Sequence, residues 1–452
     1  MAYTEYKGEY TSTKFRTNTI YSYRIYVPQV ETDKPFALLV THDGLNEGEA
    51  VAMAKLAETG EAPYCVIIGL GGEYMKPTRD GAYARGMRFN DYDIYAPEYV
   101  NFIIEDFIPY ATEKYGLNFS DNPDMHMISG GSSGGISAWN GVWFRNDYFR
   151  RVYMSSPTFS AMARGNMLPV QIRLFETKPV RAYIDWSENE PDDYFGSSYC
   201  AALEGKMALE FAGYDYQWEY HPGEGHCSRA TDPEFAEKRM RFIWKDWETE
   251  PIKVLRLSKR ADQIIFADEP WGETDSFVPN TMKATVPQGE YKIKDNAVVF
   301  CADGKEKIVA DGFSSLTSVS VSSDLWRLYI ADSLRRVIYV GSIQENGDVT
   351  DIKTLASLQT YTDFRYPGAT DICGDRYDRV YAATEMGIQC VRSYGLVELI
   401  LPLPGNIVPL RVALKGDVLY ADCGEKIFCR KIKLSEKDDH FVFEEPKFTG
   451  YY

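Results

Sequence analysis

The sequence has few cationic side chains and very few histidines. Lysine and arginine number 49 against 66 aspartates and glutamates, so the formal net charge is −17, and only five residues are histidine. Nucleic acids and anionic membrane surfaces are bound by clustered Lys and Arg, so we expect neither a nucleic-acid partner nor a membrane partner. The acidic balance favours a soluble protein with a neutral or weakly charged small-molecule substrate.

Long hydrophobic runs and closely paired cysteines are also missing. The longest apolar runs, residues 36–40 and 64–70, have the length of a strand, and the N-terminal residues lack the apolar core of a signal peptide. The eight cysteines include no Cys-x-x-Cys pair, so neither a zinc ribbon nor a thioredoxin motif is indicated. These absences predict a cytoplasmic protein with reduced thiols.

The chain nevertheless holds enough apolar material for more than one core, since 44% of its 452 residues are hydrophobic. From Tyr21 to about Trp247, strand-like and helix-like segments alternate, which predicts a mostly parallel sheet with helices on both faces. After Pro251 the sequence changes to short β-rich segments between Gly, Asp and Ser turns. We therefore expect an α/β domain over residues 1–250 and an all-β domain over residues 251–452.

The periodicity of apolar residues places the individual elements of the α/β half. The predicted strands are 22–27, 36–40, 64–70, 125–128, 151–155, 180–186 and 216–221. The predicted helices are 47–58, 97–114, 134–144, 198–212 and 233–247.

The all-β half carries a weak repeat, in which an aromatic residue is followed by Ala and then by Asp or Thr. Its members are residues 264–268, 327–332, 379–384 and 418–422. Repeats of this kind are typical of propellers, and we expect these segments to be the inner strands of the blades. At roughly 40 to 45 residues per blade, the domain has room for about four or five blades, so the propeller is small or incomplete.

The stretch most informative about chemistry is Met-His-Met-Ile-Ser-Gly-Gly-Ser-Ser-Gly-Gly, residues 125–135, which a helical pattern follows. A serine in Gly-x-Ser-x-Gly between a strand and a helix is a nucleophile elbow, whose strained turn lifts the hydroxyl above the sheet. With Gly131 and Gly135 as the flanking glycines, Ser133 is the predicted nucleophile. A Gly/Ser linker is the alternative, but linkers are not flanked by periodic hydrophobic segments.

A serine nucleophile needs a histidine base and an acid that orients this base, and in α/β-hydrolases the chain order is Ser, acid, His. Three histidines follow Ser133. His226 lies in a glycine-rich loop after the strand 216–221 and is the predicted base. His221, at the end of that strand, is the alternative, and His440 lies in the other domain.

The acid is expected beyond the strand 180–186, at its carboxyl end. Glu188, Glu190, Asp192 and Asp193 all lie in this loop, and their spacing does not separate them. A solvated acidic surface is the alternative interpretation of such a run.

An oxyanion needs two preorganised N–H donors. One is expected from the residue after the nucleophile, Gly134, and the other from the loop after the strand 36–40, through Gly44 or Leu45. The Asp-Gly sequence of this loop suits an ordinary turn equally well.

On these residues, the N-terminal half resembles the feruloyl and acetylxylan esterases of carbohydrate esterase family one and the related enterochelin esterases. The resemblance covers residues 10–247 and is carried by segments 24–28, 42–44, 88–93, 107–109, 129–135, 149–152 and 178–181. The acid loop of that family usually reads Gly-x-x-Asp, where this chain has Ser187-Glu188-Asn189-Glu190. The resemblance therefore places the acid on Glu190, with Asp192 as the fallback.

The resemblance implies an α/β-hydrolase fold and a serine esterase that removes feruloyl or acetyl groups from oligosaccharides through an acyl-enzyme, without a cofactor. A siderophore-type esterase is an alternative, although such ligands call for a basic pocket. Tyr92, Trp139, Trp186 and Phe159 would offer flat faces to a sugar or to an aromatic acid, and packing in the core is the alternative for each.

The C-terminal half resembles the later part of the gluconolactonase and regucalcin-like propellers, through segments 320–333, 369–384 and 387–389. That family holds one divalent cation with Glu, Asn and Asp. Asp371 matches the Asp, but the Asn position falls on Thr317 and the Glu could only be Glu269. A hard cation needs several oxygen ligands, so we expect no metal site. A metal-dependent sugar lactonase is thus the alternative to a propeller that binds glycans or joins copies of the chain in a homo-oligomer.

Overall fold

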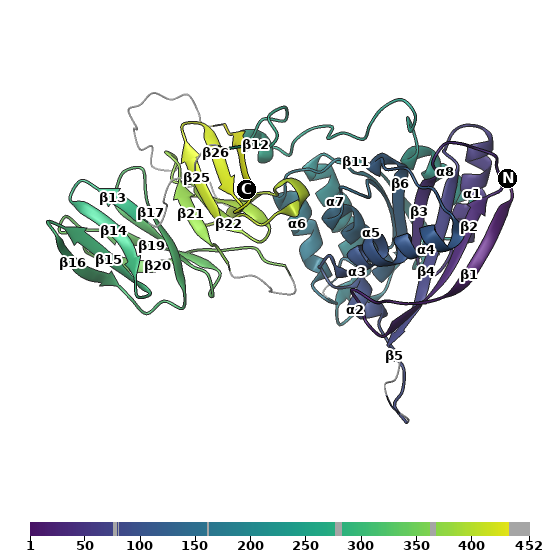
Figure 1. Cartoon of the computed structure of the whole chain (residues 1–452), viewed down its shortest axis with the longest axis horizontal. Helices are drawn as coiled ribbons and strands as arrows, with labels where there is room; N and C mark the ends of the chain where they lie inside the picture. The colour runs from purple at the N-terminus through teal and green to yellow at the C-terminus, as the bar shows by residue number, and fades with distance from the viewer. Residues whose placement is uncertain (76–78, 80, 161, 276–282, 362–367, 434–452) are drawn as a thin grey trace. The chain divides into compact units, whose positions relative to one another are not determined.

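A computed structural model describes residues 1–75, 79, 81–160, 162–275, 283–361 and 368–433. The chain divides into two compact units, and the body of the first ends at Ser258 (Figure 1). The division lies beyond the expected boundary at residue 250, because the following segment still bonds into the first unit. The Ile252 N–H donates to Asp124 (3.1 Å) and the Arg256 guanidinium donates to the Glu210 carbonyl (2.6 Å).

The first unit is built on one nine-stranded mixed sheet, in the order β1-β2-β4-β3-β6-β7-β8-β11, with β5 paired to β4. Its strands are β1 (Tyr3–Thr11), β2 (Thr19–Pro28), β3 (Ala37–His42), β4 (Cys65–Met75), β5 (Arg85–Gly86), β6 (His126–Gly131), β7 (Arg151–Ser155), β8 (Arg181–Asn189) and β11 (Asp215–Gly225). From β4 to β11 the neighbours are parallel, which confirms the predicted mostly parallel sheet.

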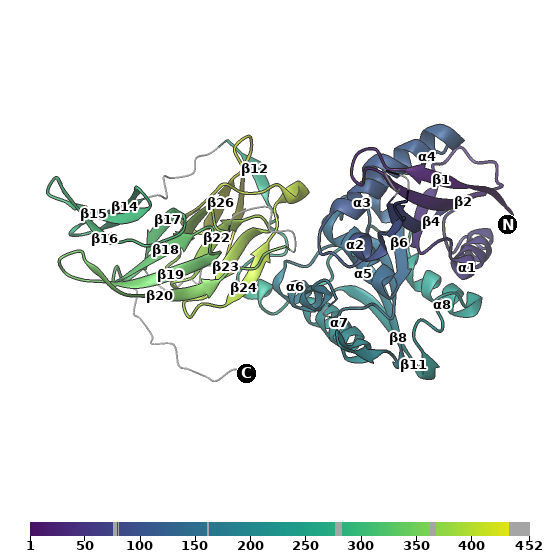
Figure 2. The same cartoon turned by 90° about the horizontal axis from the view of Figure 1, so that it is seen from below.

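Helices cover both faces of this sheet, as predicted (Figure 2). One face packs against α1 (Glu47–Glu58) and α8 (Pro233–Ile243), whose Met53, Leu56 and Met240 enter the core. The other face carries α2 (Arg88–Tyr92), α3 (Glu98–Phe102), α4 (Ile108–Tyr115), α5 (Ser133–Phe144), α6 (Leu168–Leu174) and α7 (Ser198–Ala212). No described helix combines the length and the apolar composition that a membrane span requires.

Most predicted elements of this unit are present, and two predicted helices differ. The predicted helix 97–114 is divided by a π-helical turn, Ile103–Phe107, between α3 and α4. The predicted helix 233–247 ends at Ile243, where α8 stops. Strand β1 and helix α6 were not predicted.

Among its described residues, the second unit contains four four-stranded antiparallel sheets in a propeller arrangement, which agrees with the lower of the two blade numbers expected. The first sheet consists of β13 (Lys283–Val286), β14 (Gly289–Lys294), β15 (Ala297–Ala302) and β16 (Lys305–Ala310), and the second of β17 (Leu316–Val321), β18 (Arg327–Asp332), β19 (Val337–Ile343) and β20 (Val349–Ser357). The third sheet consists of β21 (Asp371–Gly374), β22 (Val380–Thr384), β23 (Gly387–Val391) and β24 (Val397–Leu401). The fourth sheet contains β25 (Arg411–Lys415), β26 (Val418–Asp422) and β27 (Ile427–Lys431).

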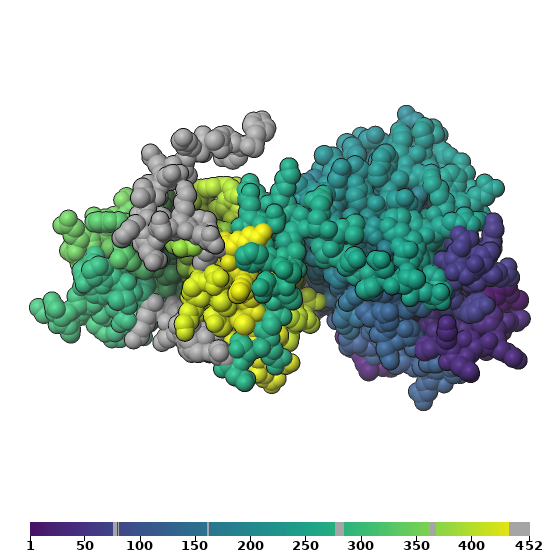
Figure 3. All heavy atoms as spheres, turned by 90° about the horizontal axis from the view of Figure 1, so that it is seen from above, coloured from purple at the N-terminus to yellow at the C-terminus, as the bar shows by residue number. Residues whose placement is uncertain are grey.

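The first strands of these sheets pack on one another in succession, β13 on β17, β17 on β21 and β21 on β25. The fourth sheet is completed at its outer edge by β12 (Gly272–Thr274), from the beginning of the unit. In the space-filling view, the teal atoms of this segment lie beside the yellow atoms of the last strands (Figure 3). Pairing of β12 with β27 therefore joins a segment near the beginning of the unit to the last described strand.

The expectation that the repeat segments are the inner strands of the blades is wrong. Segments 327–332, 379–384 and 418–422 form β18, β22 and β26, which are the second strands of their sheets. The inner position belongs to the first strands, since these make the contacts between blades. Residues 264–268 form no strand, and Ile265 makes only an isolated bridge with Ile432. The second strand of the first sheet is β14.

Candidate active site

The turn between β6 and α5 puts Ser132 in a strained conformation. Its backbone has φ 58° and ψ −126°, a region that non-glycine residues rarely adopt and that persists only where neighbours hold it. The Ser132 N–H donates to the Ser155 carbonyl (2.9 Å). The Ser132 carbonyl accepts from the N–H of Gly135 (2.9 Å) and of Thr158 (3.2 Å). Strand β7 and helix α5 together fix the turn.

Two glycines meet at this turn. A Cβ on Gly130 would lie 2.4 Å from the Gly134 carbonyl oxygen, so the strand and the helix approach each other too closely for a side chain. The motif that the structure uses as an elbow is therefore Gly130-x-Ser132-x-Gly134. The sequence contains this register as well as the one around Ser133, and the overlap was the signal that the sequence interpretation did not use.

Ser133, the residue predicted as the nucleophile, is the first residue of α5 and is 1% exposed. Its hydroxyl faces the carboxyl of Asp93, which is also buried. Burial raises the pKa of Asp93 to about 6, against the opposing effect of the Ser133 hydroxyl. Ser132, in contrast, lines an open cavity.

The predicted acid and base lie together. Glu190 directly follows β8 and His226 directly follows β11, and these strands are parallel neighbours. Nδ1 of His226 forms a hydrogen bond with Oε2 of Glu190. Oε1 of Glu190 accepts from the Ser156 hydroxyl (2.5 Å) and from the Ser187 N–H (2.9 Å). The carboxylate is thus held by three donors.

The electrostatics of this pair suit a base and its orienting acid. Burial opposes ionisation of Glu190, but the hydrogen bonds from His226, Ser156 and Ser187 outweigh it and hold the pKa of the carboxyl below its ordinary value. Hydrogen bonding with Cys227 and then with Glu190 raises the pKa of His226. Because Nδ1 is engaged by Glu190, Nε2 is the ring nitrogen left to exchange a proton.

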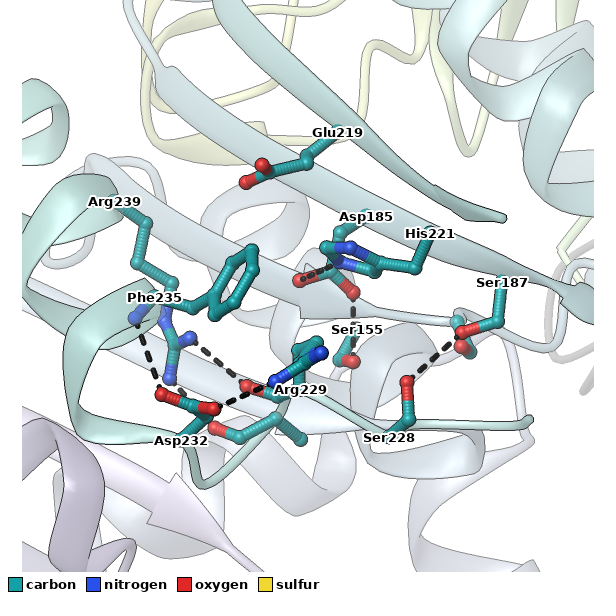
Figure 4. A network of polar contacts seen from close by, with 12 residues as sticks. Ser155, Asp185, Ser187, Glu219, His221, Ser228, Arg229, Asp232, Phe235 and Arg239 are labelled. Atoms are coloured by element: carbon teal, nitrogen blue, oxygen red, sulfur yellow. Dashed lines mark hydrogen bonds and ion pairs between the residues drawn. The ribbon is translucent and has the colours of Figure 1, made fainter. Parts of the chain in front are cut away.

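The alternatives to this pair lie elsewhere. Asp192 is exposed in a short hairpin of β9 (Asp192–Asp193) and β10 (Gly196–Ser197). His440 lies outside the described residues. His221 is buried within β11, where its Nε2 lies 3.9 Å from Oδ2 of Asp185 (Figure 4).

The Asp185 carboxylate belongs to the strand network below the site rather than to the site itself. It accepts hydrogen bonds from the hydroxyls of Tyr153 and Ser155, both at 2.8 Å. Figure 4 shows His221 and Ser155 on either side of this carboxylate. The network ties β7, β8 and β11 together beneath the residues that follow them.

The end of β3 and the turn that follows it, residues 41–45, form a segment called the oxyanion loop. The Gly44 N–H donates to the Leu70 carbonyl (2.8 Å). Since this hydrogen is already used, the expectation that Gly44 is one of the two alternative oxyanion donors is corrected. The Leu45 N–H has no hydrogen-bond partner among the described residues, and Leu45 lines the same cavity as Ser132.

A cavity of about 310 Å³ lies over the elbow. It is lined by Thr41, His42, Asp43, Gly44, Leu45, Asn46, Arg88, Ser129, Gly130, Gly131, Ser132, Tyr153, Cys227, Ala230 and Thr231. Most of these residues are polar, and the cavity contains both the Ser132 turn and the oxyanion loop.

The four aromatic residues predicted to bind substrate do not line this cavity. Tyr92 and Trp139 are 0% exposed, Trp186 is 3% exposed and Phe159 is 2% exposed. The expectation that they offer flat faces to a ligand is wrong, because each ring is enclosed by the interior of the first unit.

Asp371, the weak candidate for a metal ligand, forms hydrogen bonds between blades of the propeller. Its buried carboxylate accepts hydrogen bonds from the Ser318 hydroxyl (2.6 Å) and the Val412 N–H (3.0 Å), and so connects β17, β21 and β25. The Thr317 hydroxyl donates to the Ala369 carbonyl (2.7 Å). Within the part of the chain that the structure describes, no three His, Cys, Asp or Glu side chains are grouped to hold a metal ion.

The sheet, the elbow at the end of its central strand and the acid and histidine after later strands define an α/β-hydrolase. The chain belongs to the putative esterase family, whose model matches residues 15–311. The protein is accordingly an esterase. The arylesterase family model matches residues 276–365 in the second unit.

Solved structures with a similar fold include two esterases. A ferulic acid esterase from Anaeromyces mucronatus has 18% sequence identity, with 54% of this chain and 90% of that chain covered and a TM-score of 0.40. The enterobactin esterase from Shigella flexneri has 17% identity, with 53% and 58% covered and a TM-score of 0.38. No curated protein sequence matches this chain significantly.

Proposed function

We propose that the protein is a serine esterase whose nucleophile is Ser132. The observation that carries the proposal is the strained, positive-φ backbone of Ser132 inside the cavity. The hydrogen-bonded pair of Glu190 and His226 supports it, because the pair lies after β8 and β11, where the acid and the base of this fold belong. Cys227, directly after His226, lines the same cavity as Ser132.

In the proposed reaction, Oγ of Ser132 attacks the ester carbonyl carbon while Nε2 of His226 takes its proton. The bond to the alcohol then breaks, and the proton passes to the departing alcohol oxygen. Water, activated by the same nitrogen, attacks the acyl-enzyme and releases the carboxylic acid and Ser132. Glu190 holds the ring of His226 throughout.

The developing oxyanion would be stabilised by the N–H groups of Ser133 and Leu45. Ser133 takes this role because it follows Ser132 and begins α5, where the first N–H groups of a helix have no partner in the helix. Before substrate binds, the Ser132 hydroxyl bonds Oγ1 of Thr158 (3.0 Å). Catalytic hydrogen bonds commonly tighten only in the complex with substrate, and Ser132 then turns to His226.

For the substrate, we propose short acyl esters of carbohydrates, acetyl esters in particular. The walls of the cavity include the polar side chains of Asp43, Arg88 and Thr231, and the aromatic rings expected to hold a feruloyl group are buried elsewhere. A metal-dependent lactonase has less support, since Asp371 is engaged in contacts between blades. The propeller is proposed as a binding or oligomerisation module.

The proposal is tested by labelling the full chain with a fluorophosphonate, which reacts with activated serines, and by locating the adduct with tandem mass spectrometry. We expect the adduct on Ser132, no adduct in Ser132→Ala, and an adduct still on Ser132 in Ser133→Ala. An adduct on Ser133, or hydrolysis of 4-nitrophenyl acetate that Ser132→Ala leaves intact, contradicts the proposal.

A further inference from the structure

We propose that Arg88 is a positioning residue for the oxyanion loop. Arg88 holds Asp43, and through Asp43 it keeps the Leu45 N–H in the geometry that acyl transfer requires. The inference rests on the proposed function of the elbow. It concerns a residue that does not itself touch the reacting atoms.

The oxyanion loop needs support at Asp43. The positive φ of Gly44, 97°, has no steric cost because glycine lacks a Cβ. Asp43 has φ 59°, a region that aspartate enters more readily than most residues but that contacts of its Cβ still disfavour. Such a conformation persists only where the surrounding contacts over-determine it.

The contacts of Asp43 provide this support on two sides. Nε of Arg88 donates to Oδ1 (2.6 Å) and Nη2 donates to Oδ2 (2.8 Å). A two-bond pair of this kind fixes the orientation of the carboxylate as well as its distance. The Asp43 N–H donates to the Tyr92 hydroxyl (3.2 Å), which in turn donates to Glu73 of β4 (2.5 Å).

Two glycines of β4, which have no side chain, lie against the oxyanion loop. A Cβ on Gly69 would lie 2.3 Å from the Leu45 nitrogen, and a Cβ on Gly71 would lie 2.8 Å from the Gly44 nitrogen. The loop therefore rests on the strand itself, and the Thr41 hydroxyl closes its turn by donating to the Gly44 carbonyl (2.6 Å).

The Arg88–Asp43 pair contributes to geometry more than to global stability. Its side chains are 34% and 42% exposed, and exposed ion pairs add little to the free energy of unfolding. Hydrogen bonding to Asp43 also raises the pKa of Arg88, so the guanidinium stays charged. Loss of Arg88 is thus expected to act on the loop, and hence on the transition state.

The chain offers a matched control in the pair Arg241–Glu61. Nε of Arg241 lies 2.6 Å from Oε2 of Glu61, and the side chains are 47% and 41% exposed. Arg241 lies in the last turn of α8 and Glu61 lies beyond the end of α1. These helices follow parallel strands, so their ends lie at the edge of the sheet opposite the elbow.

The test measures kcat and KM for 4-nitrophenyl acetate, together with Tm, in Arg88→Gln, Arg88→Lys, Asp43→Asn and the control Arg241→Gln. We expect Arg88→Gln to lower kcat by about 10- to 100-fold, somewhat less than deletion of an oxyanion donor, with KM changed by less than about twofold. Arg88→Lys is expected to recover part of kcat, and Arg241→Gln to leave it unchanged. The double variant Arg88→Gln/Asp43→Asn is expected to be no slower than the slower single variant, because the pair acts as a unit.

Two outcomes overturn the inference. If Arg88→Gln keeps the kcat of the native protein, the pair does not position the loop. If it raises KM at unchanged kcat, Arg88 binds the ground-state substrate directly. If Ser132→Ala abolishes the activity, either result overturns this inference alone. If the activity survives Ser132→Ala, the proposed function is overturned as well.

Discussion

Glu190 and His226 form a hydrogen bond although 36 residues separate them along the chain. Strands β8 and β11 are parallel neighbours, so the residues that directly follow them meet at one edge of the sheet. The contact engages Nδ1 of the imidazole and turns Nε2 into the nitrogen that can serve as a base.

This contact predicts the pH dependence of the reaction. The base must be neutral, so kcat/KM is expected to rise with pH as His226 loses its proton. Hydrogen bonding with Cys227 and Glu190 raises the pKa of His226, so the midpoint lies above the ordinary value of 6.5. In Glu190→Gln the midpoint is expected to move to lower pH and the plateau to fall by about 100-fold or more. Measured pH profiles with equal midpoints in the two proteins would speak against the role of Glu190.

The register of the elbow predicts opposite results for two adjacent serines. Ser132→Ala is expected to lower kcat for 4-nitrophenyl acetate by about 10⁴-fold or more, because the nucleophile is lost. Ser133→Ala keeps the backbone N–H proposed to bind the oxyanion, so we expect kcat within about tenfold of the native value. Equal losses in the two variants at unchanged Tm are incompatible with this assignment.

The close approach of β4 to the oxyanion loop predicts the effect of Gly69→Ala. The new Cβ would lie 2.3 Å from the Leu45 nitrogen, so the loop must move. We expect kcat of the folded protein to fall by about 100-fold, as for the loss of one oxyanion donor. Gly86→Ala is the control, because no described atom lies within 4 Å of its Cβ position. Full activity of Gly69→Ala would show that Leu45 is not a donor.

The buried carboxyl of Asp93 predicts a change of stability with pH. Burial raises its pKa to about 6, above the value of about 3.9 expected in the unfolded chain. The folded protein then binds more protons between these values, so its free energy of unfolding falls as pH rises from about 4 to about 6, by roughly 3 kcal/mol. Asp93→Asn removes this loss and is expected to be more stable than the native protein at pH 7 and not at pH 4. Urea unfolding at the two pH values measures the difference.

The position of Asp371 between three inner strands predicts a purely structural effect in the propeller. Asp371→Ala removes the carboxylate that accepts from the Val412 N–H and from the Ser318 hydroxyl, so the propeller is expected to lose about 2–4 kcal/mol of stability. Hydrolysis of 4-nitrophenyl acetate is expected to be unchanged, with or without a chelator. Calorimetry of the full chain measures the loss of stability, and a chelator-sensitive activity lost in this variant would instead favour a metal-dependent lactonase.

Local patterns in the sequence were sufficient for most elements of the first unit. Helices α1 and α7 and strand β7 span the predicted residues, because apolar spacing is set by neighbours along the chain. The order of serine, acid and histidine, with each expected after a strand, likewise placed the acid and His226 in the loops where the structure has them, and the family resemblance selected Glu190 within the acid loop.

Other features depend on residues far apart in the chain, and only the tertiary structure decided them. Two overlapping Gly-x-Ser-x-Gly registers are equal as sequence, and the backbone conformation of Ser132, held by Ser155 of β7, selects one. The N–H of Gly44 is taken by Leu70 of β4, which leaves Leu45. The burial of Trp139 and the place of each repeat in its blade follow from packing between elements. The sequence by itself therefore determined which segments fold and which chemical groups the site contains, whereas contacts between distant segments determined which atoms face the cavity.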